Sequence, residues 1–276
     1  MIGISTYAYQ WRMDPRGPEP WPVERVLDDA ARLGLRLVQL CDLPELDDMS
    51  RAGAIGSSRL AALRSRAEGL GLRLELGTKG IRPGHLLAYL RMAGELGSDL
   101  VRSMLVTPDH RPTLDEARRD LASVLPEFAA SGVTLALETY EQVSTAELVG
   151  LVAGIGAEHL GICLDPGNVV ARLEHPREVV EITAPWVRNV HVKDFDFSRS
   201  PDMVGFRFAG RPLGDGLLDY GHLMDTVAPE SRGINRIIEQ WVPDQGDPGG
   251  TIAVETEWAE HAVRWLRERD AEAASR

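Results

Sequence analysis

Four side chains that could bind a metal ion stand at the ends of four short apolar segments. Glu138 follows VTLAL, Asp165 follows LGICL, His191 follows VRNV and Glu239 follows INRII. Each segment is rich in Val, Ile and Leu, which is typical of a buried parallel strand, so each polar residue is expected where such a strand ends. Three carboxylates and one imidazole suit a divalent cation of hard or borderline character. The pattern therefore predicts a metal site.

Any one of these four residues could instead form a buried ion pair or cap a strand end. Together they are harder to explain without a cation, because carboxylates that converge on one site repel each other and shift their pKa values. The sequence contains neither HExxH nor CxxC, the spacings typical of helical and structural zinc sites.

The elements that must position these side chains follow a repeating order. Several helical patterns end at a glycine directly before the next strand, as at Gly97 and Gly132, which is typical of left-handed helix caps. The order predicts an α/β protein, a single-domain (β/α)8 TIM barrel over residues 1–276, whose active site lies at the carboxyl ends of the strands. The alternative is a doubly wound open sheet, but no predicted strand is followed by GxGxxG. The predicted strands are residues 2–7, 36–42, 72–78, 100–106, 133–139, 160–165, 187–194 and 234–241.

Composition and net charge narrow the kinds of molecule that the protein is expected to bind. The chain of 276 residues has a net charge of -12 and no basic stripe, which argues against nucleic acid and against an anionic membrane surface. The two cysteines, Cys41 and Cys163, lie in apolar segments and are expected to be buried reduced thiols. The first segment of the sequence, MIGISTYAY, is typical of a strand and lacks the features of a signal peptide. We therefore expect a cytoplasmic protein that acts on a small molecule, with its oligomeric state left open.

Five segments in the second half of the chain resemble a known family. They are ALETYE, CLDPGN, NVHVKDF, PLGDGLLD and IIEQW, and in this order they are similar to the xylose isomerase-like TIM barrels, often called sugar phosphate isomerases/epimerases. The resemblance implies one divalent metal ion, Mn2+ first and Mg2+, Co2+ or Zn2+ otherwise. It also implies the ligands, which at the matching positions are Glu138, Asp165, His191 and Glu239.

Other polar residues near the predicted strand ends are candidates for contact with substrate. Lys193 lies two residues after His191, so both side chains point the same way on a strand. It is expected to bind a substrate carboxylate or stabilise an oxyanion, or else to pair with a ligand carboxylate. Asn168 faces substrate hydroxyls or caps a turn. Arg102 points toward an anionic substrate, or pairs with a carboxylate such as Glu75 or Glu138.

Residues 195–217 form the one long interruption of the repeating order. A loop of this length is often a lid or binding loop, with a disordered insertion as the alternative. We expect it to close over the site and bring Phe206 or Arg207 to the substrate. Tyr7 and Trp241 are expected to form apolar walls there, although packing in the core is the more frequent role of aromatic residues.

The implied reaction is enolisation at the metal, with Glu138 or Glu239 moving a proton and Lys193 stabilising an enediolate. This chemistry is expected first of an isomerase or epimerase that acts on a keto-sugar or keto sugar acid, and the alternative is a lyase such as a decarboxylase of a 3-oxo sugar acid or a dehydratase. The segment MVGFRFAGRPLGDG resembles the lid of the 3-oxo-isoapionate decarboxylase branch, which favours a keto sugar acid. A non-catalytic sugar-binding barrel is the remote alternative. No phosphate-binding loop is recognisable, so the sequence leaves phosphorylation of the substrate open.

Overall fold

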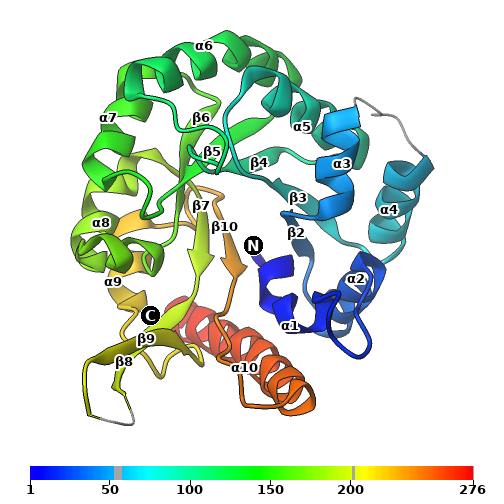
Figure 1. The fold of residues 1–276 in the computed structure, drawn as a ribbon, viewed down its shortest axis with the longest axis vertical. Coiled ribbons are helices and arrows are strands. Elements are labelled where there is room, and N and C mark those ends of the chain that lie inside the picture. Colours follow the sequence, from blue (N-terminus) through cyan, green and yellow to red (C-terminus); the bar gives the residue numbers. More distant parts are fainter. Residues whose placement is uncertain (53–57, 201–202, 276) are drawn as a thin grey trace.

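The chain folds into a closed barrel of parallel strands surrounded by helices (Figure 1). The computed structural model describes residues 1–52, 58–200 and 203–275. All strand pairings in the barrel are parallel, and the strands are hydrogen-bonded in the order β1-β10-β7-β6-β5-β4-β3-β2. The predicted (β/α)8 TIM barrel is thus confirmed. Its strands are β1 (Ile2–Ser5), β2 (Leu37–Cys41), β3 (Arg73–Gly77), β4 (Leu100–Ser103), β5 (Thr134–Glu138), β6 (Leu160–Leu164), β7 (Val187–Val192) and β10 (Asn235–Ile238).

The helices pack around the barrel and bury their apolar faces against it. Their ends follow from local sequence: Thr113 caps α6 in a capping box with Glu116, and Gly97 and Gly132 end α5 and α6 in the left-handed conformation that the sequence predicts. The helices are α1 (Gln10–Met13), α2 (Val23–Arg32), α3 (Pro44–Ala52), α4 (Ser58–Gly69), α5 (Pro83–Leu96), α6 (Leu114–Ser131), α7 (Thr145–Ile155), α8 (Pro176–Thr183), α9 (Tyr220–Val227) and α10 (Pro248–Ala274).

The segment predicted as a long loop contains two strands. β8 (Asp194–Arg199) and β9 (Phe206–Arg211) pair antiparallel and form a hairpin that lies outside the barrel, at the lower left of Figure 1. Phe alternates with charged residues in the first part of each strand, DFDF in β8 and FRF in β9, which fits the period of two in a strand.

The barrel interior also holds the two cysteines, Cys41 and Cys163, which are buried and unpaired with each other. Burial raises the pKa of the Cys41 thiol to about 12 and that of Cys163 to about 11, so both stay protonated at neutral pH. Among the described helices, none has both the length and the apolar character needed to cross a membrane.

Candidate metal centre

The four residues singled out in the sequence meet at the carboxyl ends of four neighbouring barrel strands. Glu138 is the last residue of β5, Asp165 follows β6, His191 lies in β7 and Glu239 follows β10. The four strands are consecutive in the barrel, in the order β10-β7-β6-β5. Each side chain therefore comes from a separate strand, and together they surround one point at the barrel mouth, as active-site residues of this fold do.

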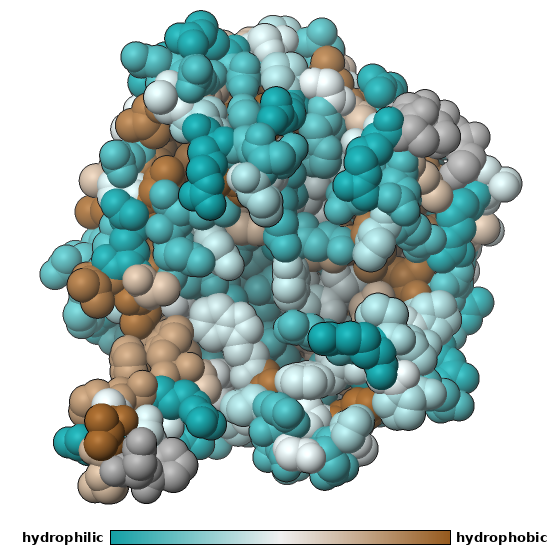
Figure 2. All heavy atoms as spheres, viewed as in Figure 1, coloured by the Kyte–Doolittle hydropathy of each residue, from teal (hydrophilic) through white to brown (hydrophobic). Residues whose placement is uncertain are grey.

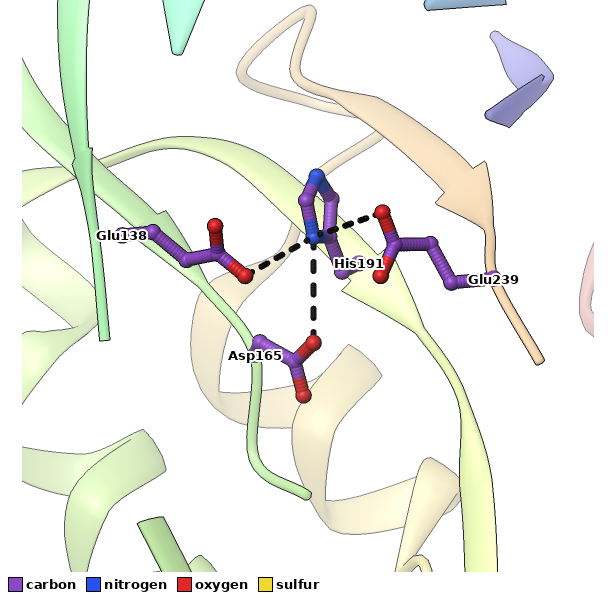
Figure 3. Close-up of side chains that lie close together, drawn as sticks. All are labelled: Glu138, Asp165, His191 and Glu239. Carbon is purple, nitrogen blue, oxygen red and sulfur yellow. Dashed lines mark ion pairs between the residues drawn. The ribbon is translucent and has the colours of Figure 1, made fainter. Parts of the chain in front are cut away.

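Their geometry is that of a cation site (Figure 3). One ligand atom from each residue lies within 4.8 Å of the other three. Nδ1 of His191 lies 3.4 Å from Oε1 of Glu138, 3.4 Å from Oε1 of Glu239 and 3.7 Å from Oδ2 of Asp165. An ion between them could reach all four at the distances of about 2.0–2.4 Å that such ligands prefer.

Two of the facing atoms lack other partners. Nδ1 of His191 and Oε1 of Glu239 are buried, and the described residues offer neither atom a hydrogen bond. Buried polar atoms without partners are rare, and a bound ion is one of the accepted explanations. The residues present therefore fit a divalent cation bound by three oxygens and one nitrogen.

Two permanent cations border the cluster. Nζ of Lys193 lies 2.6 Å from Oδ2 of Asp165 and 3.3 Å from Oε2 of Glu239. Nε of Arg102 lies 2.9 Å from Oε2 of Glu138. Three carboxylates face these two cations. Burial lowers the pKa of His191, but its neighbours, Glu239 and Asp165 among them, raise that pKa well above its usual value, so the cluster holds a further positive charge that a divalent ion would supply in place of the imidazole proton.

The pKa shifts follow from this mixture of burial and charge. Burial alone would raise the pKa of Asp165, but Lys193 and His191 lower it to about 2. Burial likewise raises the pKa of Glu138, and Arg102 and His191 outweigh that effect and lower it. Burial lowers the pKa of Lys193, whereas the carboxylates of Asp165 and Glu239 raise it above its ordinary value. At neutral pH the carboxylates of Asp165 and Glu138 are therefore ionised and Lys193 is charged.

Other predicted substrate contacts lie close to the cluster. The side-chain amide of Asn168 donates to Oε1 of Glu138 at 2.8 Å and accepts from Nζ of Lys193 at 3.1 Å. The ring of Trp241 lies over Nζ of Lys193 at 3.9 Å. The hydroxyl of Tyr7 donates to Asp42 instead of pointing at the ligands. Contact of these side chains with substrate stays a prediction.

Phe206 and Arg207 lie away from the cluster. Both are exposed on β9, and the guanidinium of Arg199 packs over the ring of Phe206 at 4.7 Å. Figure 2 shows apolar side chains gathered around the hairpin at the lower left, and the exposed ones include Phe197, Met203, Val204 and Phe206. Contact with a bound substrate would require the hairpin to move.

Phe208, two residues after Phe206, is the side chain of β9 whose ring contacts other aromatic rings near the cluster. Phe208 contacts Phe195 at 5.3 Å and Trp241 at 5.7 Å between ring centroids, so a row of rings leads from the hairpin to Lys193. Phe195 and Phe208 also line a groove of about 800 Å3 that lies beside the hairpin and contains none of the four candidate ligands. The alternation of Phe in β8 and β9 was the available signal for Phe208.

The base of the hairpin is tied to the following loop by Asp194. Its carboxylate accepts hydrogen bonds from the backbone N–H groups of Gly214, Gly216 and Leu218 at 2.9–3.0 Å. A Cβ atom at Gly216 would lie 2.3 Å from Oδ1 of Asp194, so a larger residue could not take this position without a shift. We expected residues 195–217 to bear on the site, but no sequence signal marked Asp194.

Sequence reasoning also missed a buried residue that touches the candidate ligand His191. Oε1 of Gln39, in β2, lies 2.9 Å from Nε2 of the imidazole. This contact leaves Nδ1, the atom that faces the carboxylates, as the nitrogen available to an ion. Gln39 stands in an apolar segment without any motif, so no sequence signal marked it.

Comparisons with known proteins identify relatives that match nearly the whole chain. The chain is 44% identical over 269 residues to a 3-oxo-isoapionate decarboxylase from Pectobacterium atrosepticum, which covers 98% of this chain and 96% of the relative. A xylose isomerase-like TIM barrel protein from Mycobacterium smegmatis, solved in complex with magnesium, superimposes with a TM-score of 0.69 at 16% identity and covers 95% of this chain and 96% of that one. A D-psicose 3-epimerase, solved in the presence of D-fructose, gives a TM-score of 0.69 at 14% identity and covers 96% of each chain.

The two solved structures share the fold. The family profile described as "Xylose isomerase-like TIM barrel" matches residues 27–269, a range that contains the four residues of the cluster. The chain belongs to the xylose isomerase-like TIM barrel family.

Proposed function

We propose that this protein is a divalent-metal-dependent decarboxylase of a 3-oxo sugar acid, with 3-oxo-isoapionate or a close analogue as its substrate. The observation that carries the proposal is the 44% identity to a 3-oxo-isoapionate decarboxylase, which extends over nearly the full length of both chains. The sequence alone placed isomerase or epimerase activity first. The relative favours the lyase instead, since the solved epimerase shares only 14% of its residues with this chain.

The charge of the site supports an anionic substrate. The three carboxylates and the two cations Lys193 and Arg102 leave one negative charge, and a divalent ion would turn this into one positive charge. Asp42 and Lys79 at the edge of the mouth pair with each other at 3.0 Å and cancel. A site with a net positive charge attracts a carboxylate and gives a neutral ketose no such advantage.

The proposed chemistry is loss of carbon dioxide from a β-keto acid. A divalent ion held by Glu138, Asp165, His191 and Glu239 would act as a Lewis acid toward the ketone oxygen. When the bond between the carboxylate carbon and its neighbour breaks, its electron pair remains on the sugar as an enediolate, and carbon dioxide leaves. Protonation of the carbon that carried the carboxylate then gives a ketose one carbon shorter. Mn2+ is the ion we expect, with Mg2+, Co2+ and Zn2+ as alternatives.

The protein's own residues would stabilise the charge and supply the proton. Lys193 is buried and charged, with its ammonium held between two ligand carboxylates, so it is placed to offset negative charge at the substrate. Glu239 faces both Lys193 and His191. Glu239 could therefore give a proton to the substrate and recover one from Lys193. This fits the role of proton carrier that we expect for Glu138 or Glu239.

The aromatic row would limit the access of water to this chemistry. Phe208, on β9 of the hairpin, contacts Trp241, whose ring lies over Lys193. If the hairpin moves toward the mouth as a lid, these rings would cover the substrate and strengthen the electrostatic contacts inside.

The test is a comparison of two reactions with the purified, Mn2+-loaded protein. One arm measures carbon dioxide released from 3-oxo-isoapionate and other 3-oxo sugar acids. The other measures hydrogen exchange with solvent at the carbon next to the ketone of neutral ketoses. Metal-dependent carbon dioxide release supports the decarboxylase. Exchange in ketoses without carbon dioxide release from any acid would refute it and restore the isomerase.

A further inference from the structure

A buried chain of hydrogen bonds leads from the candidate metal ligand His191 to a carboxylate deeper in the barrel. We propose that Glu75, acting through the amide of Gln39, is a positioning residue that fixes the imidazole of His191 with its proton on Nε2 and its lone pair on Nδ1, toward the ion. The inference rests on the metal centre and not on which reaction the ion serves.

The orientation of the Gln39 amide is decided by its neighbours. At one end, Nε2 of Gln39 lies 3.0 Å from Oε2 of Glu75 and 3.2 Å from Oδ1 of Asn189, and both of these atoms are acceptors. At the other end, Oε1 lies 2.9 Å from Nε2 of His191 and accepts from Sγ of Cys41 at 3.1 Å. Rotating the amide by half a turn would place an oxygen against two oxygens, so the amide oxygen must face the imidazole.

Glu75 is held in turn by amide donors on both of its oxygens. Oε2 accepts from Asn189 at 3.0 Å, and Oε1 accepts from Asn235 at 2.6 Å. The amide oxygen of Asn235 accepts from the amino terminus of Met1 at 3.2 Å, which directs its N–H2 group to Glu75. Glu75 is fully buried in the barrel, where such a network holds one arrangement only if every member is satisfied.

Strand register explains why these residues meet. Gln39 and Glu75 are direct partners in the pairing of β2 with β3, and Asn235 and Asn189 are partners in the pairing of β10 with β7. Both pairs point into the barrel and form one polar layer beneath the metal centre. The layer resembles the carboxylate–histidine arrangement of many metal sites, with an amide inserted between carboxylate and imidazole.

The test replaces the carboxylate by its isosteric amide. In Glu75→Gln, an N–H2 group can face Gln39, the amide of Gln39 is free to turn, and His191 loses its fixed acceptor. We expect the dissociation constant for Mn2+ to rise by about 10–100-fold, the usual effect of removing such an outer partner of a metal ligand. Affinity is measured by competition with a fluorescent chelator, without any substrate.

A second readout reports on the imidazole itself. In the Mg2+-loaded protein, the buried Nε2–H of His191 should give a slowly exchanging downfield proton signal in NMR spectra. Gln39→Leu, which removes the acceptor, should abolish this signal, and Glu75→Gln should weaken it or make it exchange rapidly. A purely structural role of Glu75 would lower the melting temperature without changing this signal.

The matched control is Glu255→Gln. Glu255 is also a buried carboxylate, but it accepts from the backbone N–H groups of Trp11 and Arg12 and does not contact the cluster. This variant should keep the Mn2+ affinity and the proton signal. The exchange variant Gln39→Glu/Glu75→Gln restores an acceptor for His191 and should recover affinity relative to Glu75→Gln.

The outcomes separate the proposal from the rest of the account. Unchanged Mn2+ affinity and an unchanged proton signal in Glu75→Gln would overturn it. If that variant does not fold, Gln39→Leu decides by the same two readouts. Failure of the unaltered protein to bind Mn2+ would remove the metal centre and this inference with it. Weakened binding in the variants, beside an unaltered protein that releases no carbon dioxide, would refute only the decarboxylase.

Discussion

Lys193 offers the sharpest test of the proposed electrostatics, because Lys193→Met removes a buried charge while keeping the apolar stem. In the structure its ammonium contacts Asp165, Glu239 and the ring of Trp241. Without it, the ion-loaded cluster changes from one net positive charge to none. The variant should therefore bind Mn2+ at least as tightly as the unaltered protein and yet process a keto acid more slowly.

The size of the effect follows from the type of contact. A hydrogen bond to a charged group contributes about 1.5–3 kcal/mol, which corresponds to roughly a 10- to 150-fold loss in kcat/KM. The assay is carbon dioxide release from 3-oxo-isoapionate at saturating Mn2+, together with an Mn2+ titration. The KM of neutral ketoses should be nearly unaffected, since they carry no carboxylate for Lys193 to bind.

Lys79→Met is the matched control. Lys79 is 44% exposed at the edge of the mouth and pairs with Asp42, and such pairs contribute little, about 0–1 kcal/mol. Equal losses in the two variants would show that charge at the mouth in general matters rather than Lys193. Loss of Mn2+ binding in Lys193→Met would contradict the charge balance from which the prediction was derived.

Three further outcomes are expected. Glu239→Ala should abolish Mn2+ binding and carbon dioxide release but leave the circular dichroism spectrum and melting temperature nearly unchanged, because a mouth residue contributes little to core packing; unfolding would make Glu239 a structural residue. Replacing the outer part of the hairpin, residues 197–208, by a short glycine turn should lower kcat far more than the melting temperature, whereas equal losses would argue against a lid. Burial raises the pKa of Glu255 to about 7 from an ordinary value of 4.5, despite its hydrogen bonds from two backbone N–H groups. The folded protein therefore keeps this proton where the unfolded chain loses it, so the stabilisation is full below pH 4.5 and is lost as the pH rises toward 7. In the parent protein, the free energy of unfolding should fall by up to about 3 kcal/mol between those pH values, and in Glu255→Gln this fall should be absent. Urea unfolding at several pH values measures it, and parallel pH profiles of variant and parent would disprove this.

The sequence predicts the barrel and the cluster because both depend on local pattern. A buried parallel strand is a short apolar run, and a polar residue at its carboxyl end must reach the barrel mouth, so Glu138, Asp165, His191 and Glu239 could be placed together without knowing how strands pair. The same parity placed Lys193 beside His191.

Other features depend on relationships that the chain does not display locally. Gln39 meets His191 across 152 positions only because closure and register bring β2 opposite β7. Phe206 and Phe208 lie on the same face of β9, and which of them reaches Trp241 depends on the distance along the hairpin, because Phe208 pairs with Phe197 nearer its base and Phe206 pairs with Arg199 nearer its turn. The sequence left open whether Lys193 pairs with a ligand carboxylate or faces the substrate. Only the distances from its ammonium to Asp165 and Glu239 show the pairing.

The central claim is that one divalent ion binds where the four strand ends meet. The most direct measurement is a crystal structure of the protein with Mn2+, with the ion located by anomalous scattering. We expect one strong peak within about 2.0–2.4 Å of Glu138, Asp165, His191 and Glu239, with Nδ1 as the imidazole ligand. A peak elsewhere, or an empty cluster at an Mn2+ concentration that supports turnover, would contradict the account.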